Sequence, residues 1–144
     1  MDSAEQSVAV WVELVRARER AVRHVEAVLK AHGLPPLIWY DVLWEVEKAA
    51  SDGMRPMELI PRLLLAQYAV SRLVDRLVQE GLIDRTRSPE DGRGQRLILT
   101  DAGRDMRKRM WRVYRPAITA AIGTALEPEE MAELARLLSR VGGA

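Results

Sequence analysis

The sequence predicts a mainly α-helical protein with one small β-hairpin, an α+β fold. Apolar residues recur at helical spacing over most of the 144 residues. Between residues 82 and 99 the pattern changes to two short extended pieces that flank a polar loop rich in Gly and Pro. Helical spacing then resumes to the C-terminus. These observations predict helices on both sides of a single hairpin.

Composition places the chain among ordinary globular proteins. It is 48% hydrophobic and 30% charged, and its length suits one domain, which we expect to span residues 1–144. It has no apolar run of about eighteen residues that would span a membrane. Residues 1–20 include early acidic residues and no signal-peptide pattern. The absence of cysteine excludes disulfides, zinc–thiolate sites and thiol redox sensing. A cytoplasmic location is the expectation.

The first predicted helix spans Glu5–Ala31 and is stopped by Gly33. Its apolar stripe repeats every seven residues, with two more apolar residues on the adjoining row: Val8, Val15, Val22 and Leu29, then Trp11 and Val25. The stripe is either a core face or a dimerisation seam. A helix about 40 Å long is hard for so small a monomer to cover, so dimer contact is favoured.

Three shorter segments follow with the same periodicity. Pro35 and Pro36 precede a helix over Leu37–Ala50. A short helix is expected over Met57–Leu64, and another over Gln67–Glu80, which Gly81 closes.

The hairpin consists of residues 82–87 and 95–99 around the loop 88–94. Thr100 is a good N-cap for a long helix from Asp101 toward Thr124, which Pro116 should kink. A final amphipathic helix begins near Glu127. We therefore expect a winged helix-turn-helix lobe over residues 36–100. Residues 5–32 and 101–142 are expected to form a helical dimerisation region.

The fourth helix has the character of a nucleic-acid recognition helix. One face is apolar, with Val70, Leu73, Val74, Leu77 and Val78. The other carries donors and acceptors suited to base edges and phosphates, namely Gln67, Tyr68, Ser71, Arg72, Asp75, Arg76 and Gln79. A helix fits the major groove of DNA. Taken alone, this face could equally be the solvated side of any surface helix.

The hairpin favours the DNA interpretation. Arg87, Arg93 and Arg96 concentrate positive charge where packing does not require it, and Arg93 lies between two glycines. A projecting arginine suits a narrow minor groove. Asp91 would hold the loop or orient an arginine. Residues 55–112 contain 13 Lys and Arg against 8 Asp and Glu, a local net charge of +5, within a chain of net charge +1.

Other site types are poorly supported. Trp11, Trp39, Tyr40, Trp44 and Trp111 could line an aromatic pocket, but core packing is favoured because the chain has no Phe. His24 and His32 lack the partners of a metal site. The sequence has no phosphate-binding glycine loop, nucleophile elbow or His–Glu metal motif, so we expect no catalytic residues, cofactor or enzyme activity.

The stretches 82–93 and 99–103, with Asp91-Gly92-Arg93 and Leu99-Thr100 at their observed spacing, resemble the wing of the MarR family (multiple-antibiotic-resistance regulators). Residues 70–77 resemble that family's recognition helix. The order of elements matches over nearly the whole chain.

The resemblance implies a homodimer whose first, fifth and sixth helices pair, with two winged lobes that read a pseudo-palindrome. It assigns DNA contacts to Gln67, Tyr68, Ser71, Arg72 and Arg76, and a minor-groove contact to Arg93. It also implies a small aromatic or acidic effector that loosens the complex. Two residues depart from the pattern: Ala66 replaces the usual Ser at the start of the recognition helix, and Pro61 interrupts the third helix.

The predicted function is sequence-specific binding of double-stranded DNA by a ligand-responsive repressor. The alternative is a winged-helix module that packages DNA without specificity or contacts other proteins.

Overall fold

The computed structural model describes residues 1–64, 69–87 and 94–143. The chain divides into two compact units. The lobe comprises residues 33–112, and the helical unit comprises residues 1–32 and 113–144. Gln67, Tyr68, Asp91 and Arg93 lie outside the described residues, as does Ala66.

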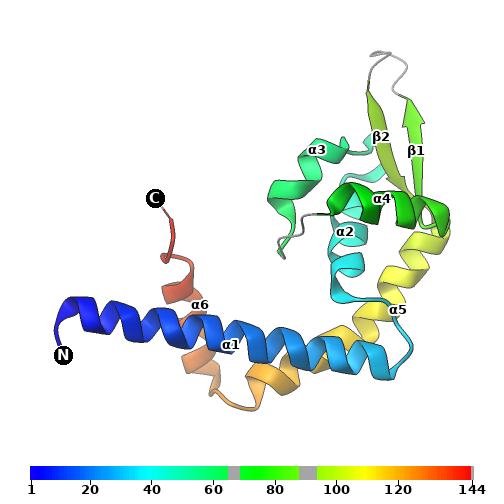
Figure 1. Cartoon of the computed structure of the whole chain (residues 1–144). Helices are drawn as coiled ribbons and strands as arrows, with labels where there is room; N and C mark the ends of the chain where they lie inside the picture. The colour runs from blue at the N-terminus through cyan, green and yellow to red at the C-terminus, as the bar shows by residue number, and fades with distance from the viewer. Residues whose placement is uncertain (65–68, 88–93, 144) are drawn as a thin grey trace. The chain divides into compact units, whose positions relative to one another are not determined.

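The lobe contains the helix-turn-helix and the hairpin (Figure 1). Its elements in chain order are α2 (Leu37–Lys48), η1 (Ala50–Asp52), α3 (Pro56–Leu59), η2 (Ile60–Arg62), α4 (Val70–Gln79), β1 (Ile83–Arg87) and β2 (Gln95–Leu99), followed by the start of α5 (Asp101–Ile118). The predicted third helix is shorter than expected. It turns into the 3-10 segment η2 where Pro61, which has no backbone N–H, cannot continue the α-helical hydrogen bonds.

A single apolar core joins these elements. Leu43 of α2, Leu77 of α4 and Leu97 of β2 are completely buried in it, together with Leu59 of α3. On α4, Val70, Val74 and Leu77 are buried, and Leu73 and Val78 are partly buried against the same core. The predicted apolar face of this helix is therefore confirmed.

The C-terminal end of α4 is fixed by backbone geometry. Gly81 has φ +75°, a left-handed conformation that favours glycine. The Leu82 N–H donates to the Leu77 carbonyl at 2.9 Å, and the Gly81 N–H donates to the Val78 carbonyl at 3.0 Å. These two bonds form the Schellman motif that the glycine predicted.

The start of α5 is tied to the same corner. The Thr100 hydroxyl accepts the Gly103 N–H at 2.9 Å, which confirms the predicted N-cap, and donates to the Gly81 carbonyl at 2.7 Å. A side chain at Gly103 would place its Cβ 2.1 Å from the Leu82 carbonyl oxygen. Glycine at 103 is therefore required by the close approach of α5 to the strand that leaves α4.

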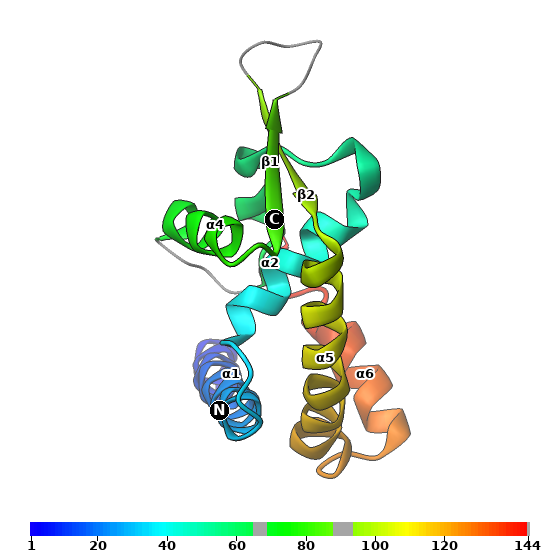
Figure 2. The same ribbon diagram turned by 90° about the vertical axis from the view of Figure 1, so that its right-hand side faces the viewer.

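β1 and β2 form a two-stranded antiparallel sheet in which Ile83 pairs with Leu99 and Arg87 with Gln95. Met54 makes an isolated bridge to Leu97 through two backbone hydrogen bonds of 3.1 and 2.8 Å. The middle of β2 is thus bonded to the segment that precedes α3. Figure 2 shows α4 beside the base of the hairpin.

The helical unit contains α1 (Ser3–Ala31), the end of α5, the π-helical turn η3 (Thr119–Gly123) and α6 (Pro128–Leu138). Capping boxes start α1, between Asp2 and Glu5, and α6, between Glu127 and Glu130. The fifth helix was expected to reach Thr124, but its α-helical part ends at Ile118. η3 contacts both α1 and α6. None of the described helices has the length and apolar character that crossing a bilayer requires.

Candidate nucleic-acid interface

The outer face of α4 is exposed and polar. Ser71, Arg72, Asp75, Arg76 and Gln79 are all exposed, opposite the residues that enter the core. Because successive helical residues are about 100° apart, these positions form one stripe along the helix. The stripe contains five hydrogen-bonding side chains and no apolar one, as direct contact with base edges and phosphates requires.

Ion pairs offset the charges of two residues in this stripe, Arg76 and Asp75. The Arg76 Nε lies 3.0 Å from the Glu80 Oε1, one turn further along the helix. Asp75 pairs with Arg85 of β1 and so connects α4 to the hairpin. Within residues 1–64, 69–87 and 94–143, Arg72 makes no ion pair. Arg72 is therefore the cation of the stripe whose charge is least offset by the described carboxylates.

Three hairpin arginines were predicted to contact DNA, and two of them, Arg87 and Arg96, lie within the described residues. These two lie on opposite faces of the hairpin. Arg87 is exposed and pairs across the sheet with Gln95, whereas Arg96 is half-buried and pairs with Thr86. Directly opposed residues share a face, and neighbours along a strand alternate. Arg87 therefore shares the face of Arg85, which contacts α4. Arg96 lies on the other face.

Arg85 was missed as a candidate. Arg85 and Arg87 are two residues apart in β1, so the period of a strand would place both on one face. The sequence alone does not show that Asp75 of α4 lies next to Arg85. The ion pair is a tertiary contact between residues ten positions apart.

The four aromatic candidates of the lobe make different contacts. Trp39 packs against the lobe core, whereas Tyr40 stacks on Trp111 with ring centroids 5.7 Å apart. Trp44 lies beneath two cations, with 5.1 Å to the Arg107 guanidinium and 5.6 Å to the Lys48 ammonium. Core packing is confirmed for Trp39.

Trp11 was expected in the core, and that expectation is wrong. It belongs to the helical unit and is 66% exposed. The reason is that the described part of the chain leaves the N-terminal half of α1 largely uncovered.

Glu47 and Arg107 connect α2 to α5 within the lobe. The Glu47 carboxylate lies 2.6 Å from the Arg107 Nε and 3.6 Å from the Arg104 Nε. Burial raises the pKa of the Tyr40 phenol, although a hydrogen bond to Arg107 and the charge of Arg107 act in the opposite direction. Arg107 therefore contacts Glu47, Tyr40 and Trp44 of α2 at once, which indicates that it stabilises the packing of α5 on α2.

No metal centre is visible in the described parts of the chain, where no three His, Asp or Glu side chains gather closely enough to hold an ion. His32 contacts the Val28 carbonyl oxygen at 2.9 Å, at the end of α1, and His24 is exposed.

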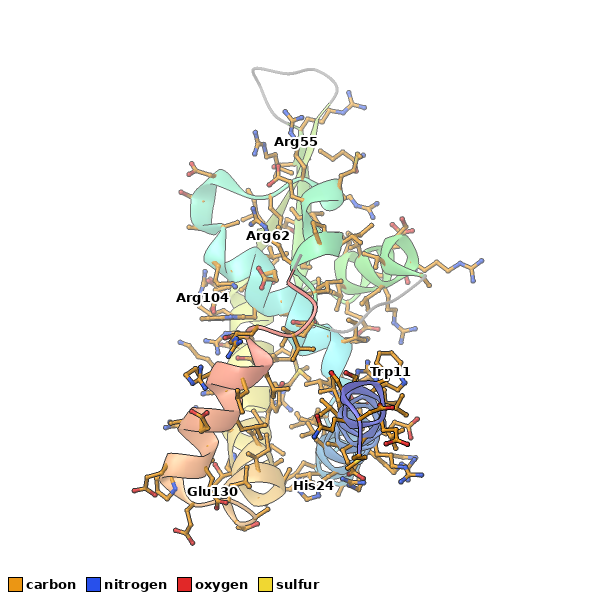
Figure 3. The ribbon with its side chains drawn as sticks, turned by 90° about the vertical axis from the view of Figure 1, so that its left-hand side faces the viewer. Trp11, His24, Arg55, Arg62, Arg104 and Glu130 are labelled. Carbon is orange, nitrogen blue, oxygen red and sulfur yellow. The ribbon has the colours of Figure 1, made fainter. Side chains whose placement is uncertain are left out.

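The helical unit carries a second candidate surface, which is apolar. The stripe of α1 is buried at Val25 and Leu29 but exposed nearer the N-terminus, where Val8 is 61% exposed. α6 and the residues after it expose four more apolar side chains: Leu134, Leu137, Leu138 and Val141. Val141 and Trp11 line a shared hollow of about 390 Å³. Figure 3 labels Trp11 on α1.

Comparison with known proteins identifies the lobe. The sequence model of the MarR family matches residues 32–94. The regulator PrsX of Escherichia coli is 30% identical over 89 residues, which cover 62% of this chain and 53% of PrsX. The regulator MhqR of Bacillus subtilis is 29% identical over 139 residues, which cover 96% of this chain and 92% of MhqR. The chain is similar to transcriptional regulators of the MarR family, and the residues that the family model matches lie almost entirely in the lobe.

A solved MarR-family structure extends the likeness to the whole fold. The chain superposes with a TM-score of 0.82 on Sco3205, a MarR family transcriptional regulator from Streptomyces coelicolor whose structure was determined in complex with DNA. The two are 26% identical, and the match covers 98% of this chain and 88% of Sco3205. The chain spans about half the length of PrsX. Its mainly helical fold with a two-stranded wing is that of the family.

Proposed function

We propose that this chain is a MarR-family transcriptional regulator that binds double-stranded DNA in a sequence-specific manner, with α4 as its recognition helix. The exposed polar stripe of α4, beside an arginine-bearing hairpin, is the observation that carries the proposal. A guanidinium can pair bidentately with guanine, and a carboxamide can do the same with adenine. α4 supplies the recognition element and the hairpin supplies the wing.

Each predicted residue receives a role in this proposal. Ser71, Arg72 and Gln67 contact base edges or adjacent phosphates. Arg76, oriented by Glu80, and Tyr68 contact phosphates. On the wing, Arg93 enters the minor groove, and Asp91 orients it. Because Arg87 and Arg96 lie on opposite faces of the hairpin, they contact the phosphate backbones of different DNA strands.

We further propose that two copies bind together as a homodimer. The exposed apolar residues of α1 and α6 support this, because contiguous exposed apolar surface marks interaction sites. A dimer with twofold symmetry reads two half-sites in opposite orientation, about one helical turn apart. The operator is therefore a pseudo-palindrome. Binding represses transcription by covering promoter DNA, and a small aromatic or acidic effector releases it.

The test is selection from a pool of random DNA duplexes with the full chain. We expect enrichment of an inverted repeat whose half-sites are separated by about ten base pairs. Arg72→Ala should then lose about 1–3 kcal/mol of discrimination at one base position of each half-site. Arg93→Ala should weaken binding to all duplexes and lower the salt dependence. Lys48→Ala is the matched control, because Lys48 lies on α2, outside the α4 stripe, the hairpin and the proposed dimer surface, and pairs with Glu45.

Some outcomes would contradict the proposal. Equal, strongly salt-dependent binding to every duplex would favour the packaging alternative. Equal losses by Arg72→Ala on selected and random duplexes would make Arg72 a phosphate contact only.

A further inference from the structure

Asp41 is a buried carboxylate, and one of its hydrogen-bond partners is far away in the sequence. It lies on α2 and is only 6% exposed. Its Oδ2 accepts a hydrogen bond of 2.7 Å from the backbone N–H of Leu64, 23 residues further along the chain. A buried carboxylate is costly unless it is hydrogen-bonded. The bond is therefore a specific tertiary contact between α2 and the segment that leads to α4.

Leu64 needs this acceptor because the preceding helical turn has ended. The last 3-10 bond of η2 runs from the Leu63 N–H to the Ile60 carbonyl. Leu63 itself is extended, with φ −72° and ψ 135°. The N–H of Leu64 thus has no acceptor within the helical turn, although the residue itself is 80% exposed. The carboxylate of Asp41 supplies the missing acceptor.

The two ends of α4 are held in different ways. At the C-terminal end, Gly81 and Thr100 fix the backbone through the bonds described above. At the N-terminal end, the N-cap residue is Ala69, and no side chain among the described residues caps the helix. Leu64 precedes that N-cap by five residues. The bond from Asp41 is thus a tertiary anchor on the chain just before α4.

We infer that Asp41 is a positioning residue for the recognition helix: its carboxylate, by holding the Leu64 amide, fixes where the chain begins its approach to α4. This inference rests on the proposed function of α4. Asp41 is buried, so it touches no DNA and acts through the contacts that it makes inside the lobe. Its loss should reduce discrimination between sequences more than it reduces general attraction to phosphate.

The experiment compares Asp41→Ala, Asp41→Leu and Asp41→Asn with the unaltered chain. The Ala and Leu variants remove the acceptor, and Leu also fills the vacated space. Asn retains an oxygen that can accept the same N–H. Glu45→Ala is the matched control, because Glu45 is also a buried carboxylate of α2, 8% exposed, but pairs with Lys48 on its own helix at 2.8 Å.

Two measurements are made on each variant. The first is hydrogen exchange at the Leu64 amide. The second is affinity for the best duplex from the selection and for a scrambled duplex, over a range of salt concentrations. For Asp41→Ala and Asp41→Leu we expect at least roughly tenfold faster exchange and roughly tenfold weaker binding to the selected duplex. We also expect a smaller loss on the scrambled duplex and an unchanged salt slope. Asp41→Asn and Glu45→Ala should stay within about threefold of the unaltered chain on both measurements.

Unchanged Leu64 exchange in folded Asp41→Ala and Asp41→Leu would overturn the inference, as would equal losses on the two duplexes. If the unaltered chain enriches no duplex, the proposed function fails instead. Faster Leu64 exchange would then still support Asp41 as the anchor of this segment.

Discussion

The lobe and the helical unit carry the same amphipathic pattern but cover it differently. In the lobe, the apolar face of α4 is nearly inaccessible: Val70 is 6% exposed, Val74 2% and Leu77 0%. In the helical unit, the apolar face of α6 stays open, with Leu134 and Leu137 more than 40% exposed. An apolar stripe therefore shows which face of a helix tends to be buried. It does not show whether residues of the same chain bury it.

This contrast assigns different roles to the two units. The lobe completes its own core from α2, α3, α4 and the hairpin, although Met57, Ile60 and Leu64 stay exposed. The exposed face of α4 is polar and is available for a polar ligand such as DNA. The helical unit leaves apolar surface that water solvates poorly. A second copy of the chain would supply the missing cover.

A large effect is expected on assembly. Trp11→Glu places a charge on the exposed stripe of α1. We expect the free energy of dimerisation to weaken by about 2–4 kcal/mol, because tryptophan is enriched among the interface residues that contribute most of the binding free energy. Sedimentation velocity over a concentration series measures this. Met57→Glu is the matched control, because Met57 is 87% exposed but belongs to the lobe. If the dimers of both variants dissociate, or if neither dimer does, the helical unit is not the unit that forms the dimer interface.

An effect of similar size, on folding instead of assembly, is expected in the lobe core. Leu77→Ala removes a completely buried side chain and should lower the free energy of unfolding by about 2–5 kcal/mol. Leu137→Ala, at a position 43% exposed, should cost about 1 kcal/mol or less when measured in the Trp11→Glu background. Urea unfolding of both variants gives the comparison. Equal losses would mean that α6 is as well covered as α4.

The smallest effect concerns the contact between α4 and the hairpin. The side chains of Asp75 and Arg85 are 62% and 35% exposed. A double-mutant cycle with Asp75→Ala and Arg85→Ala should therefore give a coupling energy of about 0.2–1 kcal/mol. A coupling well above this range would show that the ion pair, rather than the apolar core, holds the wing against α4.

Local signals in the sequence predicted the elements well where one residue type controls the backbone. Gly81 ends α4 and Thr100 starts α5, because a left-handed turn favours glycine and an N-cap needs a side-chain oxygen. Pro61 marks the change from α3 to η2. The end of α5 was less predictable, because the change to the π-helical turn η3 has no single-residue signal.

The candidate site was predicted in part. Ser71, Arg72 and Arg76 lie on the exposed face that helical periodicity assigned to them, and Arg87 is exposed on the hairpin. Their contacts with DNA stay predictions. Periodicity cannot pair residues on different elements, so the ion pair of Arg85 was not predicted. The hydrogen bond from Leu64 to Asp41 was missed for the same reason, and so was the separation of Arg87 and Arg96 onto opposite faces.

By itself, the sequence determined the order of the helices, the position of the hairpin and the polar face of α4. These depend on short-range periodicity, turn residues and caps, which act within a few residues. Only the tertiary structure decided which apolar stripes are covered, which ion pairs offset the charges of α4, and that Asp41 holds the chain before it. These depend on contacts between distant residues, since burial and partnership are set by what packs nearby rather than by the residue itself.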